Sequence, residues 1–286
     1  MKTVKKIIRG ISLLLFLFSY HSCTKEINVG VSHEKQTVIF GALQNGTNNV
    51  VLDIQNTVPV NAVENFETIN DASVAIFTKD AAGNTNIVVN DFMVNDGIYT
   101  STNEVTPTIG EMYWVEVTLL DGTLLKSEEE MLKPVVPIES IEISTDSIVD
   151  IKFSDPANDR NFYRFGVDLF ANGQLISSTF SESNDVVFDG NENASLGIEL
   201  YENNENATPY DTIRVYLQNI NSSSFQFYIN QSAQTEANDD DESSGDPSRL
   251  FATPPVNLVG NIQNTTTNKL ALGNFTVLSE SVFIQQ

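Results

Sequence analysis

The sequence predicts an all-β protein with two antiparallel β-sandwich domains, the second carrying one short helix. Three observations lead to this prediction. Apolar residues recur with a period of two from residue 37 onward, which is typical of strands with one buried face. Asn-Gly and Asp-Gly pairs, which favour tight hairpin turns, separate several of these runs. Two prolines within residues 133–137 interrupt the pattern, because proline does not fit a central strand.

Residues 1–22 have the features of a signal peptide. Four basic residues precede an apolar run at 11–18, which is shorter than the about 20 residues that a spanning helix needs. Ser22 and Cys23 follow at the place where a signal peptidase would cut. This arrangement resembles the lipobox of bacterial lipoproteins, in which the cysteine is acylated, although Tyr20 and His21 depart from its usual residues. The alternative is an ordinary secreted protein with an incidental cysteine.

Residues 23–36 are predicted to be a lipidated tether, because they contain few apolar anchors. Two or three acyl chains hold a protein on a membrane firmly, whereas one chain binds only marginally. Lys25 and Glu26 resemble the surface-export signal of Bacteroidota lipoproteins. We therefore expect a lipid-anchored protein of the outer membrane, and whether it faces the cell surface or the periplasm stays open.

Composition excludes several classes of function. The net charge is −23, and removal of residues 1–22, with four basic residues and no acidic one, makes it four units more negative. Such a chain lacks the clustered lysine and arginine that bind nucleic acid or an anionic membrane surface. Its single cysteine rules out a disulfide framework, a cysteine-rich zinc site and an iron–sulfur site.

The first domain is predicted to span residues 37–135. Its alternating runs predict about seven short strands in a sandwich of immunoglobulin or prealbumin type. Val38, Phe40 and Ala42 share one face of the first strand. Turn pairs follow at Asn45-Gly46 and at Asp121-Gly122.

The second domain is predicted to span residues 136–286, after the proline-containing boundary. Asn172-Gly173 marks its clearest hairpin. One helix is predicted from about Ser222, since Phe225, Tyr228, Ile229 and Ala233 fall at helical spacing after serines that can cap it. This aromatic face is expected to be core rather than a cofactor site.

Little in the sequence points to catalysis. After cleavage His33 is the only histidine, and it lies in the predicted tether, where a catalytic triad could not hold it. Glycoside hydrolysis needs only two carboxylates, but no pair stands out among the 38 acidic residues. We expect no enzymatic activity and no cofactor.

One acidic run is a weak candidate for binding calcium, which prefers oxygen ligands. It contains Asp239, Asp240, Asp241 and Glu242. It is not an EF-hand, because an alignment that places Gly245 at position six places Phe251 where the bidentate glutamate belongs. The alternative is a solvated loop.

Motifs in both halves resemble a known family. The second half contains Phe153-Ser-Asp155-Pro-Ala157, Asn161-Phe-Tyr163-Arg-Phe165, a Pro254-Pro255 segment leading to Asn261-Ile262, and Ala271-Leu-Gly273-Asn-Phe275. The first half contains Asp96-Gly-Ile-Tyr99, Gly110-Glu-Met-Tyr113 and Pro134. Together they resemble the Bacteroidota outer-membrane lipoproteins of domain of unknown function 4249, with departures at Phe162, Asn274 and Gln263-Asn264. The resemblance implies a lipoprotein often encoded beside a TonB-dependent transporter, and it brings no catalytic residues.

The sequence therefore favours a non-catalytic cell-envelope lipoprotein that presents a binding surface. The expected partners are the membrane, through the N-terminal lipid, and a TonB-dependent receptor in nutrient capture, but no nucleic acid. One alternative is a surface module for adhesion or assembly. A more remote alternative is a carbohydrate-active enzyme that uses paired carboxylates.

Overall fold

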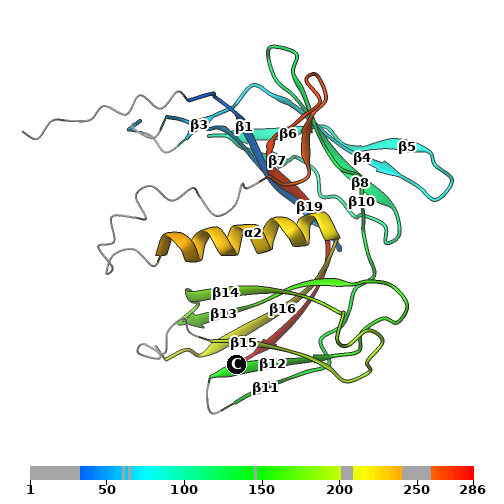
Figure 1. The fold of residues 1–286 in the computed structure, drawn as a ribbon, viewed down its shortest axis with the longest axis vertical. Coiled ribbons are helices and arrows are strands. Elements are labelled where there is room, and N and C mark those ends of the chain that lie inside the picture. The colour runs from blue at the N-terminus through cyan, green and yellow to red at the C-terminus, as the bar shows by residue number, and fades with distance from the viewer. Residues whose placement is uncertain (1–32, 60–61, 64–65, 145–146, 201–208, 240–258) are drawn as a thin grey trace, which may run out of the picture. The chain divides into compact units, whose positions relative to one another are not determined.

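Strands dominate the chain in the computed structural model, and one helix, α2 (Ser222–Asp239), accompanies them (Figure 1). The structure describes residues 33–59, 62–63, 66–144, 147–200, 209–239 and 259–286, and residues 35–286 form one unit. Nearly all strand pairs are antiparallel, so the predicted all-β class is confirmed. No helix in the described part of the chain is long and apolar enough to cross a membrane.

The largest sheet has nine strands and draws on both halves of the chain. Its order is β14-β13-β16-β19-β1-β2-β7-β6, with β3 paired to β2. The bounds are β1 Thr37–Gln44, β2 Val51–Asn56, β3 Glu67–Thr68, β6 Phe92–Asn95, β7 Ile98–Ser101, β13 Phe162–Ala171, β14 Gln174–Asn184, β16 Thr212–Ile220 and β19 Leu272–Gln285. The predicted turn at Asn172-Gly173 joins β13 to β14, with both residues at positive φ as a tight hairpin requires.

Two smaller sheets pack against this one. The seven-stranded sheet has the order β18-β17-β9-β8-β4-β5, with β10 paired to β8, and the three-stranded sheet has the order β11-β12-β15. The bounds are β4 Ser73–Lys79, β5 Thr85–Val89, β8 Met112–Thr118, β9 Leu124–Ser127, β10 Glu130–Met131, β11 Ser140–Ile143, β12 Ile148–Phe153, β15 Ala194–Glu199, β17 Ile262–Asn264 and β18 Lys269–Leu270. The first half thus contains more strands than the seven that the alternation predicts.

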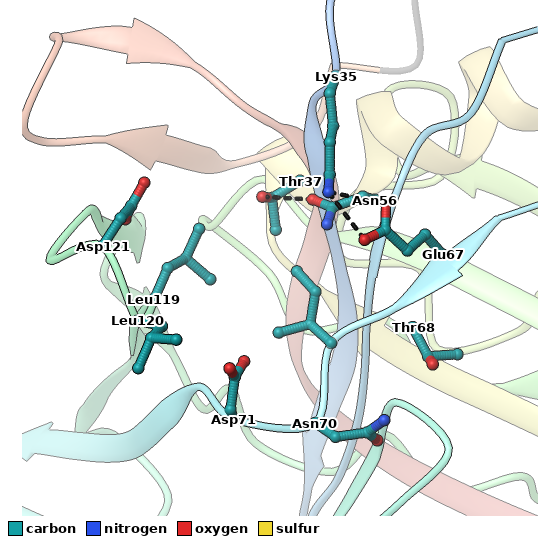
Figure 2. Close-up of a pocket in the computed structure, with 11 residues that line it drawn as sticks. Lys35, Thr37, Asn56, Glu67, Thr68, Asn70, Asp71, Leu119, Leu120 and Asp121 are labelled. Atoms are coloured by element: carbon teal, nitrogen blue, oxygen red, sulfur yellow. Dashed lines mark hydrogen bonds and ion pairs between the residues drawn. The ribbon is translucent and has the colours of Figure 1, made fainter.

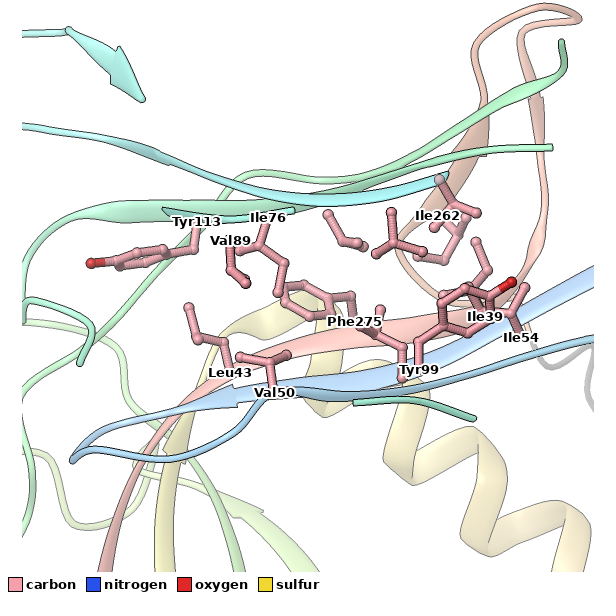
Figure 3. Packing of buried hydrophobic residues seen from close by; sticks show 14 of the residues in the cluster. Ile39, Leu43, Val50, Ile54, Ile76, Val89, Tyr99, Tyr113, Ile262 and Phe275 are labelled. Atoms are coloured by element: carbon pink, nitrogen blue, oxygen red, sulfur yellow. The ribbon is translucent and has the colours of Figure 1, made fainter. Parts of the chain in front are cut away.

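The first hydrophobic core lies between the nine-stranded and seven-stranded sheets (Figure 3). Ile39 and Leu43 of β1 point into it, whereas Phe40 on the opposite face of the strand is partly exposed. Tyr99 enters from β7 and Ile76 from β4. The alternation along β1 therefore has its buried face at the odd-numbered positions.

The second core lies between the three-stranded sheet and strands β13 and β16. It begins at Val136 and includes Phe153, Tyr163 and Leu217. The rings of Phe153 and Tyr163 meet edge to face, with centroids 5.2 Å apart. Before Val136, the last residue that belongs to the first core is Leu132. The chain therefore passes from the first core to the second at the prolines of residues 133–137.

The C-terminal strands cross the division that the sequence suggests. In β19, residues 272–278 pair in parallel with β1, and residues 279–285 pair antiparallel with β16. β17 pairs with β9, and Ile262, Phe275 and Val277 are buried in the first core (Figure 3). Residues 136–286 therefore share the nine-stranded sheet and the first core with the residues that precede them. Apolar alternation could not reveal this, because it shows which face of a strand is buried but not which strand lies beside it.

Helix α2 begins at the predicted residue and runs to Asp239, several residues beyond the predicted pattern. It packs on the face of the nine-stranded sheet that points away from the first core. The ring of Phe227 lies 6.0 Å from that of Phe40, and the Tyr228 hydroxyl is 3.0 Å from the Thr276 hydroxyl. Phe227 is buried, whereas the predicted face residue Ile229 is exposed.

Candidate functional site

A pocket of about 700 Å³ opens at one end of the first sandwich, which is within the usual size of ligand sites (Figure 2). Four short segments line it. Lys35 precedes β1 and Thr37 begins it, Asn56 ends β2, residues 67–71 come from β3 and the approach to β4, and residues 119–121 come from the turn between β8 and β9. The pocket is thus built where strand ends of both sheets meet.

One wall of the pocket is held by polar contacts. The Lys35 ammonium lies 2.7 Å from a carboxylate oxygen of Glu67, and the Thr37 hydroxyl donates to the Asn56 side-chain oxygen at 3.0 Å (Figure 2). The side-chain oxygen of Asn70 accepts the backbone N–H of Gly97 at 2.7 Å, which ties the approach to β4 to the turn between β6 and β7.

The opposite wall is the predicted turn at Asp121-Gly122. Gly122 has φ of 85°, where a side chain would be strained, and the Asp121 carboxylate accepts the backbone N–H of Thr123 at 2.9 Å. That hydrogen bond lowers the pKa of Asp121 below its usual range. Leu120, at the tip of the turn, is 81% exposed. The wall therefore combines a carboxylate with exposed aliphatic surface.

A second polar centre is buried and surrounds Glu130. Its carboxylate accepts hydrogen bonds from the hydroxyls of Ser223 and Ser224, the side-chain amide of Asn261 and the backbone N–H of Val277. Burial raises the pKa of Glu130, and these donors oppose the rise. Because its donors come from the first turn of α2 and from the C-terminal strands, Glu130 joins these elements and is structural.

Three carboxylates could supply oxygen ligands to a metal ion. Oxygens of Asp155, Asp185 and Asp189 lie within 4.8 Å of one another. The two buried members already accept hydrogen bonds: Asp155 from the Tyr163 hydroxyl at 2.5 Å, and Asp185 from the backbone N–H of Asn161 at 2.6 Å. These hydrogen bonds join two loops, so the motif residues at 153–165 have a structural role. The geometry of the three carboxylates by itself assigns no metal ion.

The residues proposed from the sequence lie elsewhere. Cys23 and the acidic residues Asp240, Asp241 and Glu242 fall outside the described residues, and Asp239 ends α2 with its side chain outside them as well. The structure therefore does not test lipid attachment or calcium binding. His33 is exposed and does not line the pocket.

Sequence reasoning missed the pocket altogether. Asp71 stands in an irregular segment, and Asp121 was identified only as a turn residue. The one available signal was Leu119-Leu120 directly before Asp121-Gly122, an apolar pair at a turn that solvent should surround.

Comparison with known proteins places the chain in a family. The sequence profile of the family described as "Domain of unknown function (DUF4249)" matches residues 24–283. No curated protein matches the chain. A chain of the solved structure "Cytokine receptor complex - Crystal form 1A" is similar over 65% of this chain and 85% of its own length, at 9% identity. Its TM-score of 0.24 supports no argument. The profile match covers nearly the whole chain after Cys23, and the protein therefore belongs to the DUF4249 family.

Proposed function

We propose that this protein is a non-catalytic, lipid-anchored binding protein of the bacterial outer membrane. In this proposal it acts beside a TonB-dependent transporter in nutrient capture, and the pocket beside Lys35 is its binding surface. The lipobox-like sequence at Cys23 supports the anchor. The transporter follows from what the family resemblance implies.

The position of the pocket in the sequence carries the proposal. Lys35 lines the pocket and follows Cys23 by 12 residues. Because an extended residue spans at most about 3.6 Å, such a segment reaches no further than about 43 Å. A pocket on so short a tether stays close to the membrane, where a captured ligand can pass to a transporter.

The chemistry of the pocket favours binding over catalysis. A glycosidase needs a general acid whose pKa is raised, and the pKa of Asp121, one of the carboxylates in the pocket, is instead lowered by its hydrogen bond to Thr123. The described residues that line the pocket include no histidine, cysteine or aromatic ring. A triad or a sugar-stacking platform therefore has no residues to build on there.

Mass spectrometry of the intact protein tests the anchor. Wild-type protein from outer membranes is expected to carry acyl chains on Cys23, and the Cys23→Ala variant is expected to carry none. If neither protein carries lipid, the anchor is wrong.

Co-purification tests the partner. Tagged wild-type protein, isolated from outer membranes after mild cross-linking, is expected to bring a TonB-dependent transporter with it, and the Cys23→Ala variant to bring much less. Recovery with no transporter contradicts the proposal. Recovery with adhesion or assembly proteins instead favours the alternative.

A further inference from the structure

The pocket beside Lys35 carries unbalanced negative charge. The Lys35 ammonium is already paired with Glu67 at 2.7 Å. Asp71 and Asp121 also line the pocket, and in the described part of the chain no lysine or arginine forms an ion pair with either. Figure 2 shows both aspartates on the side of Leu119 and Leu120, across from Lys35. A ligand that enters between them therefore meets two carboxylates without a compensating cation.

The surface next to these carboxylates is aliphatic. Leu119, Leu120 and Ile69 line the same pocket, and no described lining residue is aromatic. Leu120 is 81% exposed, so its side chain is open to a ligand in the pocket. Methylene groups suit such a surface, and lysine and arginine side chains join methylene groups to a charged end.

We infer that this pocket binds a primary ammonium or guanidinium group carried on an aliphatic chain. Asp71 and Asp121 pair with the cation, and Leu119 and Leu120 contact the chain. The inference rests on the proposed function, because it names the ligand class of the same pocket. Two sources share this chemistry: a free amine, and a lysine or arginine side chain of a partner protein.

Ligand-observed NMR on the mature protein in detergent tests the inference. The probes are 1-butylamine, as a free amine, and acetyl-Gly-Arg-Gly-amide, as a protein side chain. 1-Butanol and acetyl-Gly-citrulline-Gly-amide are their neutral counterparts. We expect at least one cationic probe to bind, neither neutral probe to bind, and binding to weaken as salt rises. The probe that binds more tightly identifies the source.

Variants make the test specific. Asp71→Asn combined with Asp121→Asn is expected to weaken binding of the cationic probe about tenfold, as for the loss of two exposed charge pairs. Glu104→Gln, which removes an exposed carboxylate outside the lining, is expected to leave binding unchanged. A circular dichroism melt checks that all variants fold.

Three results would each overturn the inference: no cationic probe binds, the neutral probes bind equally well, or the double variant binds like wild type. None of them affects recovery of a transporter from outer membranes. Failure of this inference can therefore be told apart from failure of the proposed function.

Discussion

The buried carboxylate of Glu130 accepts a hydrogen bond from the hydroxyl of Ser224 at 3.0 Å, across 94 residues of sequence. Ser224 lies in the first turn of α2, where backbone N–H groups lack partners within the helix and the helix dipole favours a negative charge. Val277 of β19 donates its backbone N–H to the same carboxylate at 3.0 Å. One side chain thus fixes the start of the helix and the last strand together.

Glu130→Gln is expected to lower the free energy of unfolding by about 1–3 kcal/mol, because the amide has one accepting oxygen in place of two, so either the N–H of Val277 or the side-chain amide of Asn261 loses its acceptor. Urea denaturation measures the change. The matched control is Glu129→Gln, which breaks only the partly exposed ion pair with Lys79 and should cost about 1 kcal/mol or less. Equal losses in both variants would contradict the structural role of Glu130.

The wild type and the Glu130→Gln variant also predict how the free energy of unfolding depends on pH. Burial raises the pKa of Glu130 above its ordinary value of 4.5, so the folded protein holds this proton to higher pH than the unfolded chain does. The contribution of Glu130 to the free energy of unfolding is therefore largest below pH 4.5, and it is lost as the pH rises through the pKa of Glu130 in the folded protein. The stability of wild type minus that of Glu130→Gln should fall over this range, and a rise would contradict the direction of the shift.

Gly273→Ala is expected to destabilise the protein by at least about 2 kcal/mol. Gly273 has φ of 98°, and a Cβ there would overlap the backbone carbonyl of Ile39 on β1. Gly83→Ala is the control, since Gly83 has φ of 85° but nothing within 4 Å of the added carbon. That variant should lose only about 1 kcal/mol from backbone strain. Thermal melts compare the two, and similar shifts would show that close approach to β1 does not matter.

Arg164→Met is expected to cost about 1–3 kcal/mol, because it removes the cation beside the Glu182 carboxylate and leaves that carboxylate only the Ser232 hydroxyl. The Arg164 guanidinium lies 4.0 Å from the ring of Phe180 and 4.4 Å from that of Tyr228, which links β13 and β14 to α2. Arg164→Met combined with Glu182→Met removes the stranded charge and should be more stable than the single variant. A double variant less stable than the single one would contradict the pairing.

Local structure could be predicted from the sequence where pattern and turn chemistry agree. The sequence predicts both β13 and the turn at Asn172-Gly173. Apolar alternation and a pair of residues that accept positive φ indicate the same hairpin. The prolines of residues 133–137, which interrupt the strand pattern, lie where the two cores change over.

Long-range pairing could not be predicted in this way. Glu130 is the last of three consecutive glutamates, which read as a solvated run, and only its pairing with Tyr113 across β8 and β10 turns it inward. The pocket residues Lys35, Asp71 and Asp121 come from separate segments with no shared spacing. Both features depend on which strands become neighbours, which a single sequence does not encode as a local pattern.

The parallel pairing of β1 with β19 has a consequence for folding during synthesis. β1 leaves the ribosome long before its parallel partner β19. Until β19 arrives, one edge of β1 has no partner and the first core lacks Phe275 and Val277. The growing chain is therefore expected to leave this part of the sheet incomplete until β19 is made, because contacts so distant in sequence form slowly.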